Sequence, residues 1–277
     1  MQNNDNFDMA NSLAVLKKGF VSQYDGSSHI QEILPAESTE SLQINHAHLQ
    51  DLHTFAKNNP IYHNSFQMEI SGVSCVVYEG DINSYWLDSI KHNSSCQPFY
   101  PTWILSAYIS VLNAKNLGCI SIVDVGSGDG RIAYCARILG LDVCSIEIDY
   151  MLAKLQCNIA ESTGMDFECF CTDATDFDYS NTGFNTAFFI GGLPQMGGDM
   201  LADATIRSVL ESSSKDPMFV FAGSHAKKNL SSSVKNGGWD ALIKRHSLKV
   251  IDTIILPTIW TFDQKIDTPY IFTRIDL

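Results

Sequence analysis

Residues 120–131 hold the clearest chemical signal of the sequence, Ile-Ser-Ile-Val-Asp-Val-Gly-Ser-Gly-Asp-Gly-Arg. An apolar run typical of a buried strand ends in Asp124, and a helix begins directly after a glycine-rich turn, so backbone N–H groups would meet at a crevice above the strand's carboxyl end. The glycines that permit positive φ and close approach of a ligand are Gly126, Gly128 and Gly130. Their G-x-G-x-G spacing differs from the G-x-G-x-x-G of dinucleotide-binding proteins, and Asp124 and Asp129 would repel a pyrophosphate. The turn therefore favours a cationic ligand.

Acidic residues also follow the next two predicted strands. Glu147, in Ile146-Glu147-Ile148-Asp149, comes about twenty residues after the turn, where one carboxylate can accept both hydroxyls of a ribose. Asp173 can accept a hydrogen bond from an exocyclic amine, and the N–H of Ala174 can donate to a ring nitrogen. Taken singly, each feature also fits an ordinary strand–helix connection, with Glu147 as a solvated strand end and Asp173 as an Asx turn. Their order and spacing together predict contacts for an amino-acid moiety, a ribose and a base.

As a set, VDVGSGDGR followed by SIEID resembles the motifs of the class I S-adenosylmethionine-dependent methyltransferases, over roughly residues 98–277. The resemblance implies S-adenosylmethionine as the cofactor, with the turn as its binding loop, Glu147 as the ribose acid and Asp173 as the adenine contact. It also implies that Gly191-Gly192-Leu193-Pro194, after the fourth strand, faces the methyl group. The cofactor-binding residues it implies are Asp124, Gly126, Ser127, Gly128, Gly130, Glu147, Ile148, Asp173, Ala174 and Gly191.

The loop after the fourth strand departs from one part of that family. Members that methylate bases or glutamine carry Asn/Asp-Pro-Pro-Tyr/Phe there, whereas this chain has Gly-Gly-Leu-Pro, which puts such acceptors in doubt. Phe99-Tyr100-Pro101-Thr102 and VGSGDGR are more similar to a subgroup that contains lysine methyltransferases of proteins. A protein side-chain amine or a small molecule is therefore the favoured acceptor, and its identity stays open. No catalytic base can be named; Tyr100 is a candidate for lining the methyl pocket, although a tyrosine before a helix is more often a packing residue.

Two other functions are compatible with parts of this pattern. A catalytically inert methyltransferase-like subunit could scaffold or regulate a partner, because a fold does not fix a function. Such a subunit would bind the cofactor and transfer no methyl group. A nicotinamide oxidoreductase is opposed by the glycine spacing.

Strands and helices alternate from Ile120 onward. Apolar runs predict strands at 120–125, 143–148, 167–171, 186–190 and 218–222, and helical patterns lie between them at 131–139, 151–162 and 201–210. This alternation predicts a mostly parallel sheet covered on both faces. Residues 250–256 and 270–275 leave no room for a full helix between them and should pair as an antiparallel hairpin. We expect an α/β fold whose seven-stranded, mostly parallel, doubly wound sheet has an antiparallel last strand, as the resemblance implies.

The residues before this zone predict further helices and one hairpin. Apolar residues recur at helical spacing over 9–20 and 44–56. A short hairpin over 68–78 turns at Ser71-Gly72. Asp81 can cap a helix that extends to Ile90, and Pro101 can open another that ends at Gly118.

These patterns divide the chain into two parts. We expect a mainly helical N-terminal extension over 1–95 and a methyltransferase domain over 96–277. Because the motifs lie after Ile120 while the first helices carry apolar faces that need a surface, we expect the extension to cover the acceptor site. It should then shape acceptor choice more than cofactor binding.

The charge of the chain argues against nucleic acid as a partner. Lys and Arg number 18 against 31 Asp and Glu, a net charge of −13 over 277 residues, and such a balance repels a phosphate backbone. No apolar stretch is long enough to span a membrane, and no secretory signal is present, so we expect a cytoplasmic protein. The eight cysteines include no C-x-x-C pair, and no metal site is expected. The oligomeric state stays open.

Overall fold

A seven-stranded sheet forms the centre of the molecule. The computed structural model describes residues 2–83, 85, 99–212, 216–223, 238–258 and 267–276. The strands of this sheet lie in the order β6 (Glu168–Cys171), β5 (Asp142–Glu147), β4 (Ser121–Val125), β7 (Thr186–Ile190), β8 (Met218–Ala222), β10 (Asp267–Ile275) and β9 (Leu248–Pro257). The first five strands are parallel, and β10 is antiparallel to both β8 and β9. The predicted sheet and its terminal antiparallel pair are therefore confirmed.

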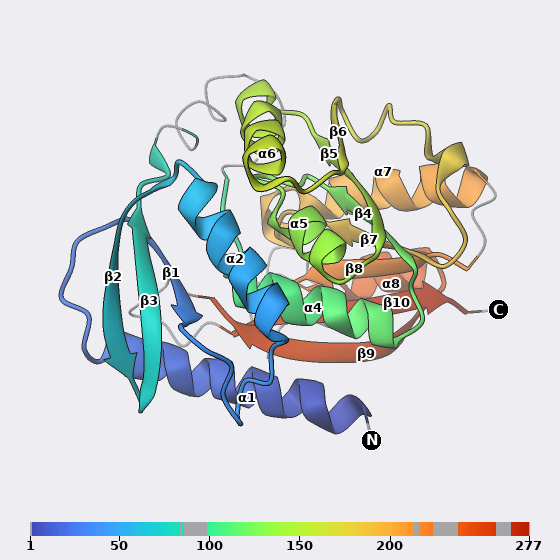
Figure 1. Ribbon diagram of the computed structural model, residues 1–277. Coiled ribbons are helices and arrows are strands. Elements are labelled where there is room, and N and C mark those ends of the chain that lie inside the picture. Colours follow the sequence, from blue (N-terminus) through green and yellow to red (C-terminus); the bar gives the residue numbers. More distant parts are fainter. Residues whose placement is uncertain are drawn as a thin grey trace.

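Helices cover both faces of this sheet (Figure 1). On one face lie α4 (Ile104–Asn116), α5 (Arg131–Ile138) and α6 (Tyr150–Thr163), and on the other lie α7 (Gly198–Glu211) and the short α8 (Asp240–Arg245). Short 3₁₀ turns occur at Tyr179–Asn181 and Pro194–Met196. Side chains of β7 alternate between the layers, because Ala187 and Phe189 pack with the first group of helices and Phe188 and Ile190 with the second. The sheet is thus buried on both faces, as its continuous apolar strands predict.

The N-terminal extension contains more β structure than its sequence pattern predicts. Its elements are α1 (Gln2–Val21), β1 (Ile30–Pro35), α2 (His46–Asn58), β2 (Tyr62–Ile70) and β3 (Val73–Gly80). The β2–β3 hairpin and both helices are confirmed, and Ser71 and Gly72 form its turn with φ of 52° and 80°. The strand β1 was not predicted, because Gln31 and Glu32 interrupt its apolar residues although both are buried. It pairs with β3 and completes a three-stranded antiparallel sheet.

The extension and the central sheet share one hydrophobic core. The helix α1 packs along β9 and α4, and α2 packs against α5 and α6 (Figure 1). Leu13, Leu16 and Phe20 of α1 belong to the same buried cluster as Ile122 and Phe189 of the central sheet. Most of the helix expected over 81–90 and the expected domain boundary at 95/96 lie outside the described residues. Within the part of the chain that the structure covers, no helix has the length and apolar character needed to cross a membrane.

Candidate functional site

A cavity of about 470 Å³ lies at the carboxyl ends of the parallel strands. This edge is where open α/β sheets bind their ligands. Nearly all of the residues expected to form a site line this cavity: Asp124, Gly126, Ser127, Gly128, Glu147, Ile148, Asp173, Ala174 and Gly191. Gly130 does not. It is the N-cap residue of α5 with φ of 76°, and a Cβ at this position would lie 2.9 Å from Cγ of Gln156.

The N–H groups of the glycine-rich turn are used within the protein. Those of Gly126 and Ser127 donate to the carbonyl of Ile146 at 2.9 and 3.2 Å, and that of Gly130 donates to the carbonyl of Ser127 at 2.9 Å. We expected these groups to face the crevice, and the hydrogen bonds show that they instead fix the turn against the end of β5. Because these three N–H groups already have acceptors within the protein, they are not available to bind a phosphate.

Glu147, the last residue of β5, closes the turn from the other side. Its Oε2 accepts from the N–H of Gly128 at 2.7 Å and its Oε1 from the N–H of Asp149 at 3.0 Å. The side chain is 6% exposed, and burial raises its pKa to about 6 while the two N–H groups oppose the shift. Asp149 instead caps α6, accepting from the N–H groups of Met151 and Leu152 at 2.8 and 3.2 Å. The two neighbouring acids therefore have different structural tasks.

Asp124, near the end of β4, is a deeply buried acid that faces the cavity, and no cationic partner of its carboxyl group lies among the described residues. It is 4% exposed, and its Oδ2 accepts from the N–H of Ala133 at 3.3 Å. Burial raises its pKa to about 8, and the charges of Glu147 and Asp129 add to the shift. A bound cation would stabilise the ionised form of this carboxyl group.

Residues after β6 form the far wall of the cavity. Asp173 makes an Asx turn, in which its Oδ1 accepts from the N–H and the hydroxyl of Thr175 at 2.9 and 2.8 Å. The same side chain also lines the cavity, together with Ala174 and the half-exposed Ile148. Asp173 therefore forms the Asx turn and also lines the cavity.

Gln156 of α6 holds the turn and was missed by the sequence interpretation. Its Nε2 donates to the Ser127 hydroxyl and to the Gly128 carbonyl, both at 2.7 Å, and its Oε1 accepts from the Ser145 hydroxyl at 2.7 Å. The side chain is fully buried. A signal was present, because position 156 lies four residues after Leu152 on the apolar face of the helix, where a polar residue needs a buried partner.

Gly191 brings the loop after β7 against the turn. Its N–H donates to the carbonyl of Val125 at 2.7 Å, and a Cβ at this position would lie 2.7 Å from the carbonyl oxygen of Gly126. Any side chain here would push the two loops apart. The loop expected to face the methyl group is therefore in contact with the loop expected to hold the cofactor.

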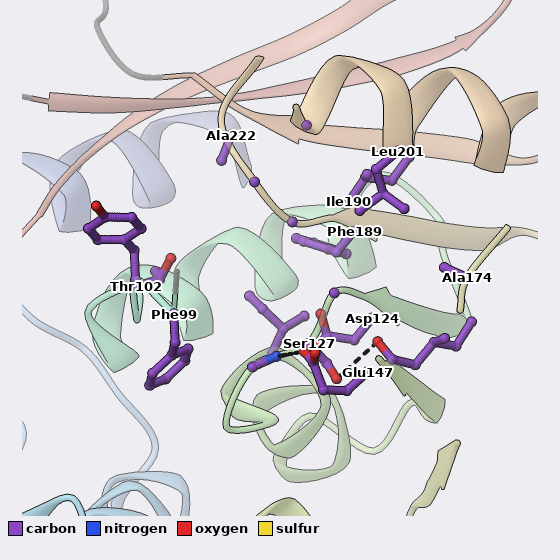
Figure 2. A pocket seen from close by; sticks show the side chains of 18 of the residues that line it. Phe99, Thr102, Asp124, Ser127, Glu147, Ala174, Phe189, Ile190, Leu201 and Ala222 are labelled. Atoms are coloured by element: carbon purple, nitrogen blue, oxygen red, sulfur yellow. Dashed lines mark hydrogen bonds between the residues drawn. The ribbon is translucent and has the colours of Figure 1, made fainter. Parts of the chain in front are cut away.

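The opposite end of the cavity is mainly apolar. Figure 2 shows Phe99 and Thr102 at one end, away from Glu147 and Ala174, with Ala222 along another wall. Tyr100, named above as a candidate for lining the methyl pocket, also lines this cavity. Burial raises the pKa of Tyr100, and it raises that of Tyr270 to about 12, so both phenols are protonated at neutral pH.

No residue of 2–83 lines the cavity, nor does residue 85. The expectation that the extension covers the acceptor site is therefore not met by its described part. That part instead meets the outer side of the glycine-rich turn, where Asn59 donates to Asp129 at 2.9 Å.

Comparison with known proteins gives matches of structure only, since no protein-family model and no curated protein matches this sequence. A solved structure described as "Conversion of a Disulfide Bond into a Thioacetal Group during Echinomycin Biosynthesis" is 15% identical with a TM-score of 0.52, over 69% of this chain and 92% of that one. An S-adenosylmethionine-dependent methyltransferase from Clostridium acetobutylicum is 9% identical with a TM-score of 0.47, over 70% and 97%. A candidate RNA methyltransferase from Pyrococcus horikoshii is 17% identical with a TM-score of 0.47, over 62% and 83%.

The chain has the class I methyltransferase fold. Its strand order, with an antiparallel β10 between β8 and β9, is the arrangement that the sequence resemblance implied. At these identities the likeness is one of fold, and chemistry has to be argued from the cavity itself.

Proposed function

We propose that this protein is an S-adenosylmethionine-dependent methyltransferase. The observation that carries the proposal is that acids from the ends of three successive strands line one cavity of about 470 Å³. They are Asp124 near the end of β4, Glu147 as the last residue of β5 and Asp173 directly after β6. A ligand with an amino-acid end, a ribose and a base would meet these carboxylates in that order.

The charge of the cavity supports a cationic cofactor over a nicotinamide dinucleotide. The charged residues that line it, within the described part of the chain, are Asp124, Asp129, Arg131, Glu147, Asp149 and Asp173. The only cation among them, Arg131, is already paired with Asp129 at 2.5 Å. The surplus of acids would repel a pyrophosphate, whereas S-adenosylmethionine carries an ammonium and a sulfonium against one carboxylate.

Each lining group has a proposed contact. Asp124 would lie near the ammonium group, Glu147 would accept the ribose hydroxyls, and Asp173 with Ala174 would bind the adenine. The turn residues Gly126, Ser127 and Gly128, together with Ile148 and Gly191, would pack against the cofactor. Gly130 acts indirectly by allowing α5 to begin directly after the turn.

The bound cofactor would supply an electrophilic methyl group, and the protein would align the acceptor with it. In-line displacement at a sulfonium depends on positioning, so close alignment can supply much of the rate. The apolar end of the cavity, with Phe99, Pro101 and Val220, would exclude water around the acceptor. Because Tyr100 and Tyr270 stay protonated, neither is assigned as a base. We favour a protein amine or a small molecule as the acceptor, because the net charge of −13 opposes a nucleic acid.

Two measurements test this function. Calorimetry should detect binding of S-adenosylmethionine and S-adenosylhomocysteine and no binding of NAD. Incubation of methyl-labelled S-adenosylmethionine with cell extract, followed by separation into protein, RNA and small molecules, should show which class receives the label.

The two results together decide between the alternatives. Binding with transfer supports the enzyme, and label on RNA would overturn the preferred acceptor class. Binding without transfer to any fraction would favour the inert scaffold. Binding of NAD instead of S-adenosylmethionine would contradict the proposal.

A further inference from the structure

Arg131, the first residue of α5, lies in a buried cluster of polar side chains beside the glycine-rich turn. Its Nε and one terminal nitrogen donate to the two oxygens of Asp129 at 2.8 and 2.5 Å. The other terminal nitrogen donates to Glu32 Oε2 at 3.1 Å and to the carbonyl of Thr102. Arg131 is 3% exposed, and Asp129 and Glu32 are no more exposed than that. We call Glu32, Asn59, Tyr62, Asp129 and Arg131 the buried hub.

Three members of the buried hub come from the extension. Glu32 lies on β1, Asn59 follows α2 and Tyr62 begins β2. The Tyr62 hydroxyl donates to Glu32 Oε2 at 3.0 Å and accepts from Arg131 at 3.4 Å, while Asn59 Nδ2 donates to Asp129 Oδ2 at 2.9 Å. The extension therefore surrounds the ion pair whose acid belongs to the turn.

Glu32 also connects the hub to the opposite wall of the cavity. Its Oε1 accepts from the N–H of Ile104, at the start of α4, at 2.9 Å. Arg131 in turn donates to the carbonyl of Thr102, a residue that lines the cavity. One buried carboxylate thus links the cofactor turn and the segment that leads into α4.

Buried polar groups act as a unit, because loss of one partner leaves the others without hydrogen bonds in a low-dielectric environment. Asp129 lies between Gly128 and Gly130, whose φ values are 59° and 76°. Glycine has little intrinsic preference for one φ value, so these residues do not fix the backbone of the turn by themselves. A fixed Asp129 carboxylate therefore restrains the backbone at the point where Glu147 binds Gly128.

We propose that the extension supplies positioning residues for the glycine-rich turn, namely Glu32, Asn59 and Tyr62. They act through Asp129 and Arg131, and they do not touch the ligand. The extension is in this way a part of the cofactor site. The inference rests on the proposed function only for the identity of the ligand.

The test compares two tyrosines of the same small sheet in the full chain. Tyr62→Phe removes a hydroxyl from the buried hub. Tyr78→Phe is the control, because Tyr78 is also buried but its hydroxyl pairs with Nδ1 of His53 at 2.8 Å. Each variant removes one tyrosine hydroxyl of the extension, and with it the bonds to Glu32 and Arg131 in one case and the bond to His53 in the other. A purely structural role therefore predicts a loss of stability in both variants and no difference between them at the cofactor site.

Two readouts are compared. Calorimetry with S-adenosylmethionine should show a dissociation constant that is raised about fivefold or more in Tyr62→Phe and unchanged in Tyr78→Phe. A fivefold change is at the lower end of the range found for coupling between distant sites. Hydrogen exchange of the cofactor-free protein should show faster exchange at the Gly128 and Gly130 amides in Tyr62→Phe alone. Asn59→Asp, which keeps the acceptor for the Ile61 N–H and loses the donor to Asp129, should behave like Tyr62→Phe.

Equal changes in Tyr62→Phe and Tyr78→Phe, in either readout, would overturn the inference. If the unmodified protein binds no S-adenosylmethionine, the proposed function fails, and hydrogen exchange at the turn still decides the role of the hub. If Asn59→Asp does not fold, the tyrosine pair alone gives the answer.

Discussion

Alanine at Gly128 and at Gly126 should destabilise the protein to different degrees. Both glycines have positive φ, 59° and 69°, so an alanine at either pays the same backbone penalty of about 1–2 kcal/mol. Their surroundings differ. A Cβ at Gly128 would lie 2.5 Å from Cε2 of Phe99, whereas a Cβ at Gly126 finds its nearest atom, Cδ2 of Leu201, at 3.6 Å.

The expected losses follow from these distances. A contact of 2.5 Å is well below ordinary carbon–carbon separation, so the buried ring of Phe99 must move. Overpacking of this kind adds about 1–3 kcal/mol. The free energy of unfolding should therefore fall by about 1–2 kcal/mol in Gly126→Ala and by about 2–5 kcal/mol in Gly128→Ala. Urea denaturation of the cofactor-free proteins measures both values.

Removing the ring supplies the control. In a Phe99→Ala background, the additional loss from Gly128→Ala should shrink to that of Gly126→Ala, because only the backbone penalty remains. Equal losses for the two glycine variants in the unmodified protein would refute this account of the turn. An undiminished loss after removal of the ring would exclude Phe99 as its cause.

Three further predictions concern the acids. Glu147→Ala should weaken S-adenosylmethionine binding by about 1.5–3 kcal/mol in calorimetry, whereas Asp149→Ala should mainly lower the unfolding free energy by about 0.5–2 kcal/mol through loss of the α6 cap; the reverse pattern would exchange their assignments. Asp173→Ala should lower affinity for S-adenosylmethionine and S-adenosylhomocysteine by the same factor, since both carry the adenine, and a loss for one alone would place Asp173 away from the base. Because burial raises the pKa of Asp124 from 3.8 to about 8, the folded state holds this proton more tightly, and stability should fall as pH rises through that interval. Asp124→Asn should then be more stable than the unmodified protein at pH above about 8, with the difference shrinking toward about pH 4; a difference independent of pH would contradict this.

The alternating strands and helices of the central sheet could be predicted from the sequence, because the local residue pattern of each segment matches its environment in the fold. Residues 186–190 and 218–222 are short apolar runs that become β7 and β8 with the predicted bounds. The turn glycines could also be recognised from the sequence, because their positive φ values restrict the residue type. For such segments the local sequence is enough to predict the local structure.

Contacts between segments that are distant in the chain could not be predicted from the sequence. Glu32 looks like a surface residue that interrupts an apolar strand, yet it is buried because Arg131, about a hundred positions later, supplies its partner. Gln156 and Phe99 likewise gain their roles only from the turn that they touch. The prediction that the turn N–H groups face the crevice was wrong for the same reason, since the acceptors of these groups include the Ile146 carbonyl on β5 and the Glu147 side chain.

Because α1 packs along β9, this helix waits for a strand that is synthesised much later. The helix ends at Val21 and β9 begins at Leu248. At ribosomal rates of about 5–20 residues per second, the interval lasts roughly 10–45 s. During that time Leu13, Leu16 and Phe20, which are buried in the finished protein, lack their final packing surface. The nascent chain therefore carries an apolar segment in α1 that chaperones can bind until β9 has been synthesised.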